Sequence, residues 1–283
     1  MAVYELRREF SLKLLFQVAN LKKSTYHYHV QKLNRPDKYE KIKDAIQRIY
    51  TQAKGLYGYR RMVFALKKEN IHLNHKTVRR LMTELKLKGL RKQKKYSSHR
   101  GEVGQIAPNL IQRNFEAAQP NEVWLTDVTE FKVNGKKLYL SAFLDVFNRE
   151  IVGYEITQNP NFQLIERSFN NSIQHLKYNK NSHPIIHSDQ GWLYQIPRFR
   201  SMISTFEMTQ SMSRKGNCYD NALMESFFGI LKNECIYREK FQNIHQAKQS
   251  IDNYIQFYNQ TRIKEKFNGM SPVEYRLAKQ KTA

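Results

Sequence analysis

The chain has 283 residues, a net charge of +23 and two cysteines. Its length suits about two domains, and two thiols exclude both a disulfide framework and a cysteine-rich zinc site. No apolar run is long enough to cross a membrane and the first residues do not form a signal peptide, so a cytoplasmic location is expected. Residues 1–120 hold 27 Lys and Arg against 9 Asp and Glu, whereas residues 121–283 hold 21 against 16. This basic front half favours a nucleic-acid partner over a ribosome-associated or merely soluble basic protein.

The front of the chain is patterned as short helices. Residues 10–34 predict two of them, with Ser11 and Ser24 as their caps. A longer helix is predicted from Pro36, a residue favoured in the first helical turn, to Gly55. Three apolar residues of the first helix are expected to face inward: Leu14, Leu15 and Val18.

A helix-turn-helix is predicted at about residues 58–90. Two amphipathic helices flank the tight polar turn "NIHLN", and Asn74 is expected to cap the second helix. Basic residues lie on the second helix opposite its apolar stripe, where a groove-reading helix requires them: Lys76, Arg79 and Arg80. The segment that follows supplies further cations for phosphate contacts: Arg91, Lys92, Lys94 and Lys95. The alternative is a small helical bundle with a solvated basic face.

Residues 97–121 lose the helical period and gain Ser, Gly, Pro and Asn, which predicts a linker. From residue 122 onward, short apolar runs and a period of two predict strands instead. Three strands form an antiparallel meander, whose first two members are joined by the hairpin signal Asn134-Gly135. A helix over residues 162–176 follows, and then strands and helices alternate. The order βββαβαβα predicts a mixed α/β sheet flanked by helices.

Three acids lie in elements that bury one face. Asp127 is in the middle of the first strand, Asp189 ends the apolar strand "PIIHS", and Glu225 lies in the apolar helix "NALMESFFGILK". Each acid alone has a structural explanation, as a hydrogen-bonded strand acid, a helix cap and an ion-pair partner respectively. If the three converge, their carboxylate oxygens form the kind of site that Mg²⁺ or Mn²⁺ prefers. Strand ends of α/β sheets are where ligands gather.

The motifs around these acids resemble a known family. Thirty-five residues separate Asp189 from Glu225. That spacing, with "WLTDVTEF", "HSDQGWLY" and "SMSRKGNCYDNALMESFFGILKNE", closely resembles the D,D(35)E core of retroviral integrases and insertion-sequence transposases. Lys232, the front segment "GYRRMVFALKKENIHLNHKTVRRLM" and the tail "YNQTRIKEKFNGMSPVEY" are similar to motifs of the same group. The chain resembles the second-frame (OrfB) protein of the large insertion-sequence family with two overlapping reading frames, the IS3 type.

The resemblance implies a fold and a division of the chain. An all-α DNA-binding region with the helix-turn-helix occupies residues 1–96. After the linker, residues 122–240 form the catalytic core, a ribonuclease-H-like mixed five-stranded α/β sheet with flanking helices. Residues 241–283 form a C-terminal helical tail.

The resemblance also implies a chemistry and a set of partners. It assigns Asp127, Asp189 and Glu225 as ligands of Mg²⁺ (or Mn²⁺), with two ions in each active site, and as the residues that catalyse DNA strand cleavage and strand transfer. The partners it implies are the double-stranded DNA of the element ends and the target, further copies of the chain on DNA, and the first-frame (OrfA) protein. No membrane is involved, and the location is the bacterial cytoplasm.

Helical geometry adds candidate DNA contacts beside Glu225. Asn221 and Lys232 lie on the same side of the helix as this acid, and small Ala222 and Gly229 leave room there for a DNA backbone. The alternatives are tight helix packing for Ala222 and Gly229 and solvation for Lys232. Further DNA contacts are expected from the turn before the helix: Arg214, Lys215 and Asn217.

The sequence leaves the roles of two residues and the choice between two functions undecided. His187 either helps to orient the site or is a hydrogen-bonded strand histidine. Asp145 also ends a strand, but no spacing connects it with the three acids. The alternative to an active transposase is a DNA-binding regulatory product of the element without independent catalytic activity.

Overall fold

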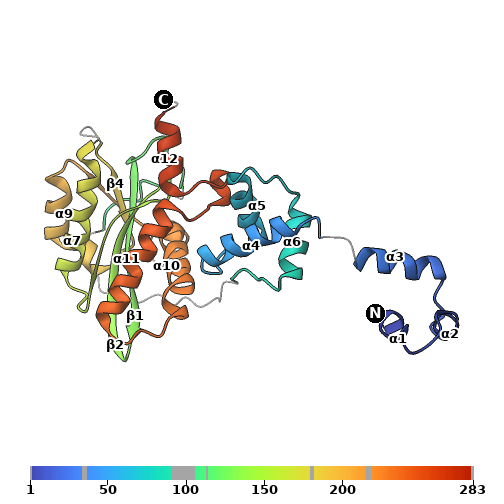
Figure 1. Cartoon of the computed structure of the whole chain (residues 1–283). Helices are drawn as coiled ribbons and strands as arrows, with labels where there is room; N and C mark the ends of the chain where they lie inside the picture. Colours follow the sequence, from blue (N-terminus) through green and yellow to red (C-terminus); the bar gives the residue numbers. More distant parts are fainter. Residues whose placement is uncertain are drawn as a thin grey trace.

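The computed structural model describes residues 2–33, 37–90, 106–112, 114–178, 182–214 and 218–281. A mixed five-stranded sheet lies at the centre of the back half (Figure 1). Its strands are β1 (Val123–Val133), β2 (Lys136–Asp145), β3 (Ile151–Thr157), β4 (Ile185–Ser188) and β5 (Thr209–Met212). The spatial order is β3-β2-β1-β4-β5, with β1, β2 and β3 antiparallel and β4 and β5 parallel to β1. The predicted ribonuclease-H-like fold class is confirmed.

The β1–β2 hairpin turns at Asn134 and Gly135, whose φ angles are +46° and +76°. A two-residue turn with positive φ at both positions is the one that matches the twist of the strands, so this prediction is confirmed.

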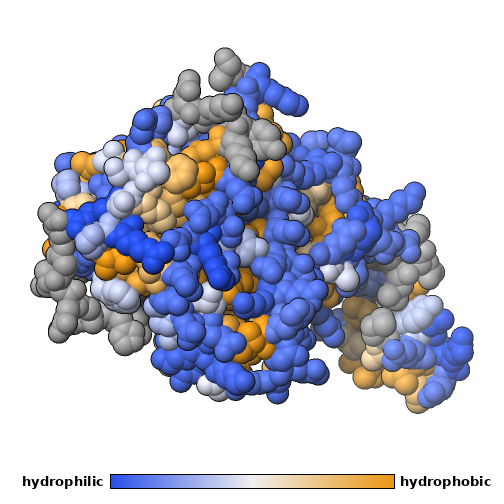
Figure 2. All heavy atoms as spheres, turned by 90° about the vertical axis from the view of Figure 1, so that its left-hand side faces the viewer, coloured by the Kyte–Doolittle hydropathy of each residue, from blue (hydrophilic) through white to orange (hydrophobic). Residues whose placement is uncertain are grey.

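Helices cover both faces of the sheet (Figure 1). One face packs against α10 (Ala222–Glu234) and α11 (Ile244–Gln260), and their apolar residues share a core with Leu125 and Leu140. The other face packs against α7 (Phe162–Ile173), α8 (Trp192–Gln195) and α9 (Pro197–Ser204), around Trp124 and Phe143. Short helices complete the back half: η1 (Gln174–Tyr178), η2 (Cys218–Asn221), η3 (Ile236–Arg238), η4 (Glu265–Phe267) and α12 (Pro272–Gln280). On the face shown in Figure 2, hydrophilic residues predominate and hydrophobic ones form separate patches.

A second core belongs to the helical module, which we define as α4 (Glu40–Gln52), α5 (Tyr59–Lys68) and α6 (His75–Glu84). Asn74 caps α6 as predicted, because its side chain accepts a hydrogen bond from the backbone of Lys76. Pro36, the predicted start of α4, lies outside the described residues.

Three helices precede the module: α1 (Ala2–Leu6), α2 (Leu12–Val18) and α3 (Lys23–Leu33). Ser11 caps α2 as predicted, but α3 begins one residue before Ser24, so the second predicted cap is wrong. The inward orientation predicted for α2 is also wrong for two residues. Leu15 is buried, whereas Leu14 and Val18 are 48% and 79% exposed. The physical reason is a missing partner, since residues of this region belong to none of the buried clusters in the described chain.

None of the helices in the described part of the chain combines the length and the hydropathy that crossing a lipid bilayer requires.

Candidate active site

Strands β1 and β4 and helix α10 bring the three predicted acids to one place. In the parallel β1–β4 pair, Leu125 lies beside His187. Continuing that register by two residues places Asp127 beside Asp189, which directly follows β4. Glu225 lies in the first turn of α10, and the buried apolar side of that helix fixes it to the sheet. Asp189 and Glu225 both repel the charge of Asp127, so the three carboxylates form one electrostatic cluster.

This cluster resists full ionisation. Burial raises the pKa of Asp127 well above its usual value, and repulsion by Asp189 and Glu225 adds to the shift. Two neighbours oppose it: the backbone N–H of Val128, which donates to Asp127 Oδ1 at 2.7 Å, and the ammonium group of Lys232. A cation placed among the carboxylates would relieve the repulsion.

Asp189 combines an exposed position with a partly desolvated carboxylate. Although the residue as a whole is exposed at the end of β4, its carboxylate faces protein, and the lost hydration raises its pKa. The backbone N–H of Gly191 donates to Asp189 Oδ1 at 2.8 Å and acts in the opposite direction. The side chain is therefore held by its own loop while its charge remains destabilised.

Tyr194 belongs to the site and was missed by sequence reasoning. Its side chain is buried, and its hydroxyl group lies 3.4 Å from Thr126 Oγ1. Burial and the charges of Asp127 and Asp189 raise the pKa of Tyr194 well above its usual value. Its position five residues after Asp189, inside the quoted motif, was the only available signal.

One side of α10 faces the acids. Asn221 is buried, and its Nδ2 donates to the Thr126 carbonyl at 3.5 Å, while its Oδ1 has no hydrogen-bond partner in the described chain. A methyl group added at Gly229 would meet no atom within 4 Å, so the helix surface there is open. Lys232 is half-buried, and burial lowers its pKa although Asp127 opposes the shift.

The candidate DNA contacts of the helical module lie on the exposed side of one helix, α6. Lys76, Arg79 and Arg80 are exposed on α6. The Arg79 guanidinium lies 5.8 Å from the centre of the Tyr59 ring, and Arg80 pairs with Glu84 at 3.5 Å. The four predicted contacts after the module lie outside the described residues: Arg91, Lys92, Lys94 and Lys95.

The turn before α10 is only partly described. Arg214 is exposed, and its guanidinium binds the buried Asp220 carboxylate through two nitrogens, each at 3.1 Å. This pairing fixes the turn and compensates the charge of Arg214. Lys215 and Asn217 lie outside the described residues.

The two open residues have structural roles. His187 Nδ1 lies 2.9 Å from Ser211 Oγ, and Nε2 lies 3.0 Å from the Asp220 carbonyl, so His187 is a hydrogen-bonded strand histidine. Asp145 accepts backbone hydrogen bonds from Asn121 at 2.8 Å and from Phe147 at 2.9 Å. Asp145 therefore stabilises the connection between β2 and β3 and is not part of the cluster of three acids.

The site contains oxygen ligands that suit a cation, but in the described residues they are not arranged as a metal-binding site. In the described ranges, no group of three or more His, Cys, Asp or Glu side chains is arranged to hold a metal ion. Three carboxylates and the unpartnered Asn221 Oδ1 nevertheless supply the oxygen ligands that Mg²⁺ and Mn²⁺ prefer. The residues fit such an ion provided that the carboxylates draw together when it binds.

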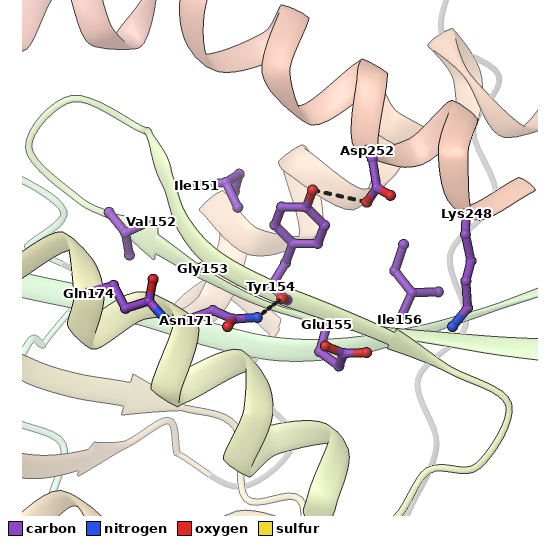
Figure 3. Close-up of a pocket in the computed structure, with 10 residues that line it drawn as sticks. All are labelled: Ile151, Val152, Gly153, Tyr154, Glu155, Ile156, Asn171, Gln174, Lys248 and Asp252. Carbon is purple, nitrogen blue, oxygen red and sulfur yellow. Dashed lines mark hydrogen bonds between the residues drawn. The ribbon is translucent and has the colours of Figure 1, made fainter.

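A surface pocket lies elsewhere, beside the edge strand β3 (Figure 3). It measures about 510 Å³ and is lined by β3, α7 and α11. Three of its polar side chains bond within the fold, because Tyr154 donates to Asp252 and Asn171 donates to the Tyr154 carbonyl. It contains none of the three acids.

Comparison with known proteins identifies the family of the chain. Two models, both described as Integrase core domain, match residues 117–218 and 225–279, and a model described as HTH-like domain matches residues 38–95. The chain is 47% identical over 272 residues to the putative transposase InsK for insertion sequence element IS150 of Escherichia coli (strain K12), covering 96% of this chain and 95% of that protein. It is 29% identical over 276 residues to the transposase InsF for insertion sequence IS3A of the same organism, covering 94% of both. Among solved structures, the catalytic core domain of HTLV-2 integrase in complex with magnesium gives a TM-score of 0.44 at 17% identity, covering 56% of this chain and 98% of that one. The chain belongs to the IS3 family of insertion-sequence transposases, with an integrase core domain and an HTH-like region.

Proposed function

We propose that this transposase cleaves DNA at the ends of its element and joins the freed 3′ ends to target DNA, with Asp127, Asp189 and Glu225 as its catalytic residues. The observation that carries the proposal is the mutual repulsion of these carboxylates beside the unpartnered oxygen of Asn221. Acids that destabilise one another in the absence of a cation are typical of functional sites. Two Mg²⁺ or Mn²⁺ ions would activate the attacking oxygen and stabilise the leaving oxygen of an in-line displacement.

The residues of the chain would have different roles in holding the ions and the DNA. Asp127 interacts electrostatically with both other acids and would hold both ions, with Asp189 on one side and Glu225 on the other. The open surface at Gly229 admits a DNA backbone, and Lys232 would pair with a phosphate next to the acids. No side chain has to act as a covalent nucleophile, because water breaks the phosphodiester in cleavage and a 3′-hydroxyl attacks in joining.

DNA is bound by the exposed cations of α6, Lys76, Arg79 and Arg80, with the cations around residue 92 adding phosphate contacts. We further propose that the chain works on double-stranded DNA as a multimer of its own copies, together with the first-frame (OrfA) protein. The assignment of the three acids depends on neither the multimer nor the first-frame protein.

The catalytic assignment is tested with labelled duplexes that carry the element ends. Asp127→Asn, Asp189→Asn and Glu225→Gln should each abolish Mg²⁺-dependent cleavage and joining and reduce the rise in melting temperature that Mg²⁺ causes. Asp145→Asn is the matched control, because Asp145 is a buried strand acid outside the cluster, and it should retain both properties. Wild-type cleavage by the Glu225→Gln protein would refute the assignment. Tight DNA binding by a wild-type chain that cleaves nothing would instead support the regulatory alternative.

The DNA-binding assignment is tested separately. The double variant Arg79→Ala, Arg80→Ala should bind end DNA more weakly and with a shallower salt dependence, because fewer counterions are released. Arg48→Ala is the control, since Arg48 is an exposed arginine of α4 that is paired with Glu69 at 2.6 Å. An unchanged salt slope in the double variant would remove α6 from the DNA interface.

A further inference from the structure

The C-terminal segment crosses onto the helical module and completes its core. Ile263 is 3% exposed and belongs to the apolar cluster of α4, α5 and α6. The Tyr57 hydroxyl group donates to the Thr261 carbonyl at 3.3 Å and accepts from the Ile263 backbone N–H at 3.4 Å. The module therefore docks on the tail through apolar and backbone contacts.

The same segment makes a second, closer contact. Gly269 has a φ of +86°, and a methyl group added there would lie 2.6 Å from Phe64 Cδ1, so only glycine permits this approach. Lys68 and Glu274 form an exposed ion pair at 2.8 Å across the same interface. These contacts join the module to the tail but do not reach the catalytic helix.

A buried charge network does reach it. Glu234, the last residue of α10, accepts from Arg262 Nε at 2.7 Å and Nη2 at 2.6 Å, and from the Tyr254 hydroxyl group at 2.9 Å. Its Oε1 also lies 3.6 Å from Nη1 of Arg61, a residue of α5 in the helical module. The exposed fractions of the Glu234, Arg262 and Arg61 side chains are 10%, 3% and 24%. The module is thus joined by a partly buried ion pair to the helix that carries Glu225.

The position of Glu234 determines which part of the catalytic core the Arg61–Glu234 pair connects to the module. Glu225 and Glu234 are nine residues apart on one helix, a separation of about 13 Å along the axis. A partly buried ion pair adds little net stability, because desolvation offsets its attraction, but it favours the arrangement in which the two charges meet.

We propose that Arg61 and Glu234 are positioning residues that hold the helical module at one fixed orientation to the catalytic helix, so that DNA bound by α6 is presented to Glu225 at one spacing. The proposal rests on the proposed function, since it takes α6 as a DNA contact and Glu225 as a catalytic residue. Neither positioning residue touches the reacting atoms.

The first experiment measures orientation without DNA. Spin labels carried on unnatural amino acids replace the exposed residues Thr83 of α6 and Lys136 of the β1–β2 hairpin, and pulsed electron paramagnetic resonance gives their distance distribution. Arg61→Met removes the ion pair but leaves Glu234 bound to Arg262, so the core should still fold. This variant should broaden the distribution at least twofold, whereas Arg61→Lys, which keeps the charge, should remain narrow. Lys68→Gln is the matched interface control and should also remain narrow. A distribution for Arg61→Met as narrow as that of wild type would overturn the proposal.

The second experiment measures spacing. End duplexes carry an insertion of five base pairs, about half a helical turn, between the segment protected by the module and the cleaved bond. Wild type and Lys68→Gln should lose about tenfold or more in cleavage rate on the inserted duplex. Arg61→Met should lose much less, with unchanged affinity for the original duplex. Equal proportional losses in all three proteins would mean that the pair is merely structural. If wild type cleaves no duplex, the proposed function fails, and the distance measurement still decides the orientation.

Discussion

Replacing Asp145 by asparagine should alter the pH dependence of folding stability while leaving DNA cleavage intact. Burial is the main cause that raises the pKa of Asp145 from 3.8 to about 6, and the N–H groups of Asn121 and Phe147 oppose it. At about 1.4 kcal/mol per pKa unit, the ionised carboxylate destabilises the folded state by about 3 kcal/mol. Between pH 3.8 and about 6 the folded state binds more protons than the unfolded state, so this group lowers stability as pH rises through that window.

The assay is a pair of urea titrations in EDTA, for wild type and Asp145→Asn, at pH 4.5 and pH 7.5. The fluorescence of Trp124 is the signal for unfolding of the core, because Trp124 is fully buried and pairs with Asp145 across β1 and β2. The free energy of unfolding of wild type minus that of the variant should be about 2 kcal/mol smaller at pH 7.5 than at pH 4.5. The rest of the effect of about 3 kcal/mol develops below pH 4.5. Contributions from groups that do not interact with Asp145 are the same in both proteins and cancel. A stability difference that is the same at both pH values would refute the reasoning.

Four further predictions concern the candidate site and the elements that support it. Asp127→Asn should raise the melting temperature of the metal-free protein at pH 8, because the raised pKa of Asp127 means that its ionised form destabilises the fold; an equal or lower melting temperature would contradict this. Lys232→Met should slow cleavage at low DNA concentration while leaving the Mg²⁺ requirement unchanged, as measured by single-turnover kinetics at several Mg²⁺ concentrations. Gly153→Ala should destabilise by about 1–3 kcal/mol, because the added carbon would lie 2.1 Å from Ser172 Oγ. Gly229→Ala, which meets no neighbour, should stabilise by about 1 kcal/mol, and thermal unfolding compares the two.

The features that sequence predicted well are those with local signals. Burial alternates only near the hairpin ends of β1 and β2, whereas the rest of both strands is largely buried on both faces. Asn134-Gly135 supplies the positive φ angles that the hairpin needs. The three acids were singled out because a fixed spacing and three motifs, one around each acid, mark them. Their convergence required the register of β1 and β4, which sequence alone did not supply.

The features that were missed or mistaken depend on distant partners. Leu14 and Val18 have the period of an inward face, yet no described element covers them, so periodicity alone gave the wrong burial. Tyr194 enters the site only because the folded sheet brings its hydroxyl group beside Thr126. The Arg61–Glu234 pair joins two regions that no sequence pattern connects.

The burial of Ile263 in the core of the helical module has a consequence for how the protein is made. Tyr57 and its partner Thr261 are 204 residues apart, so at typical rates of synthesis the ribosome adds the second residue roughly 10 to 40 seconds after the first. The module is thus completed by a residue that is translated 204 positions after Tyr57. A chain that stops before Thr261 lacks the residue that closes this core, so its helical module is expected to be less stable than that of a chain that contains Ile263.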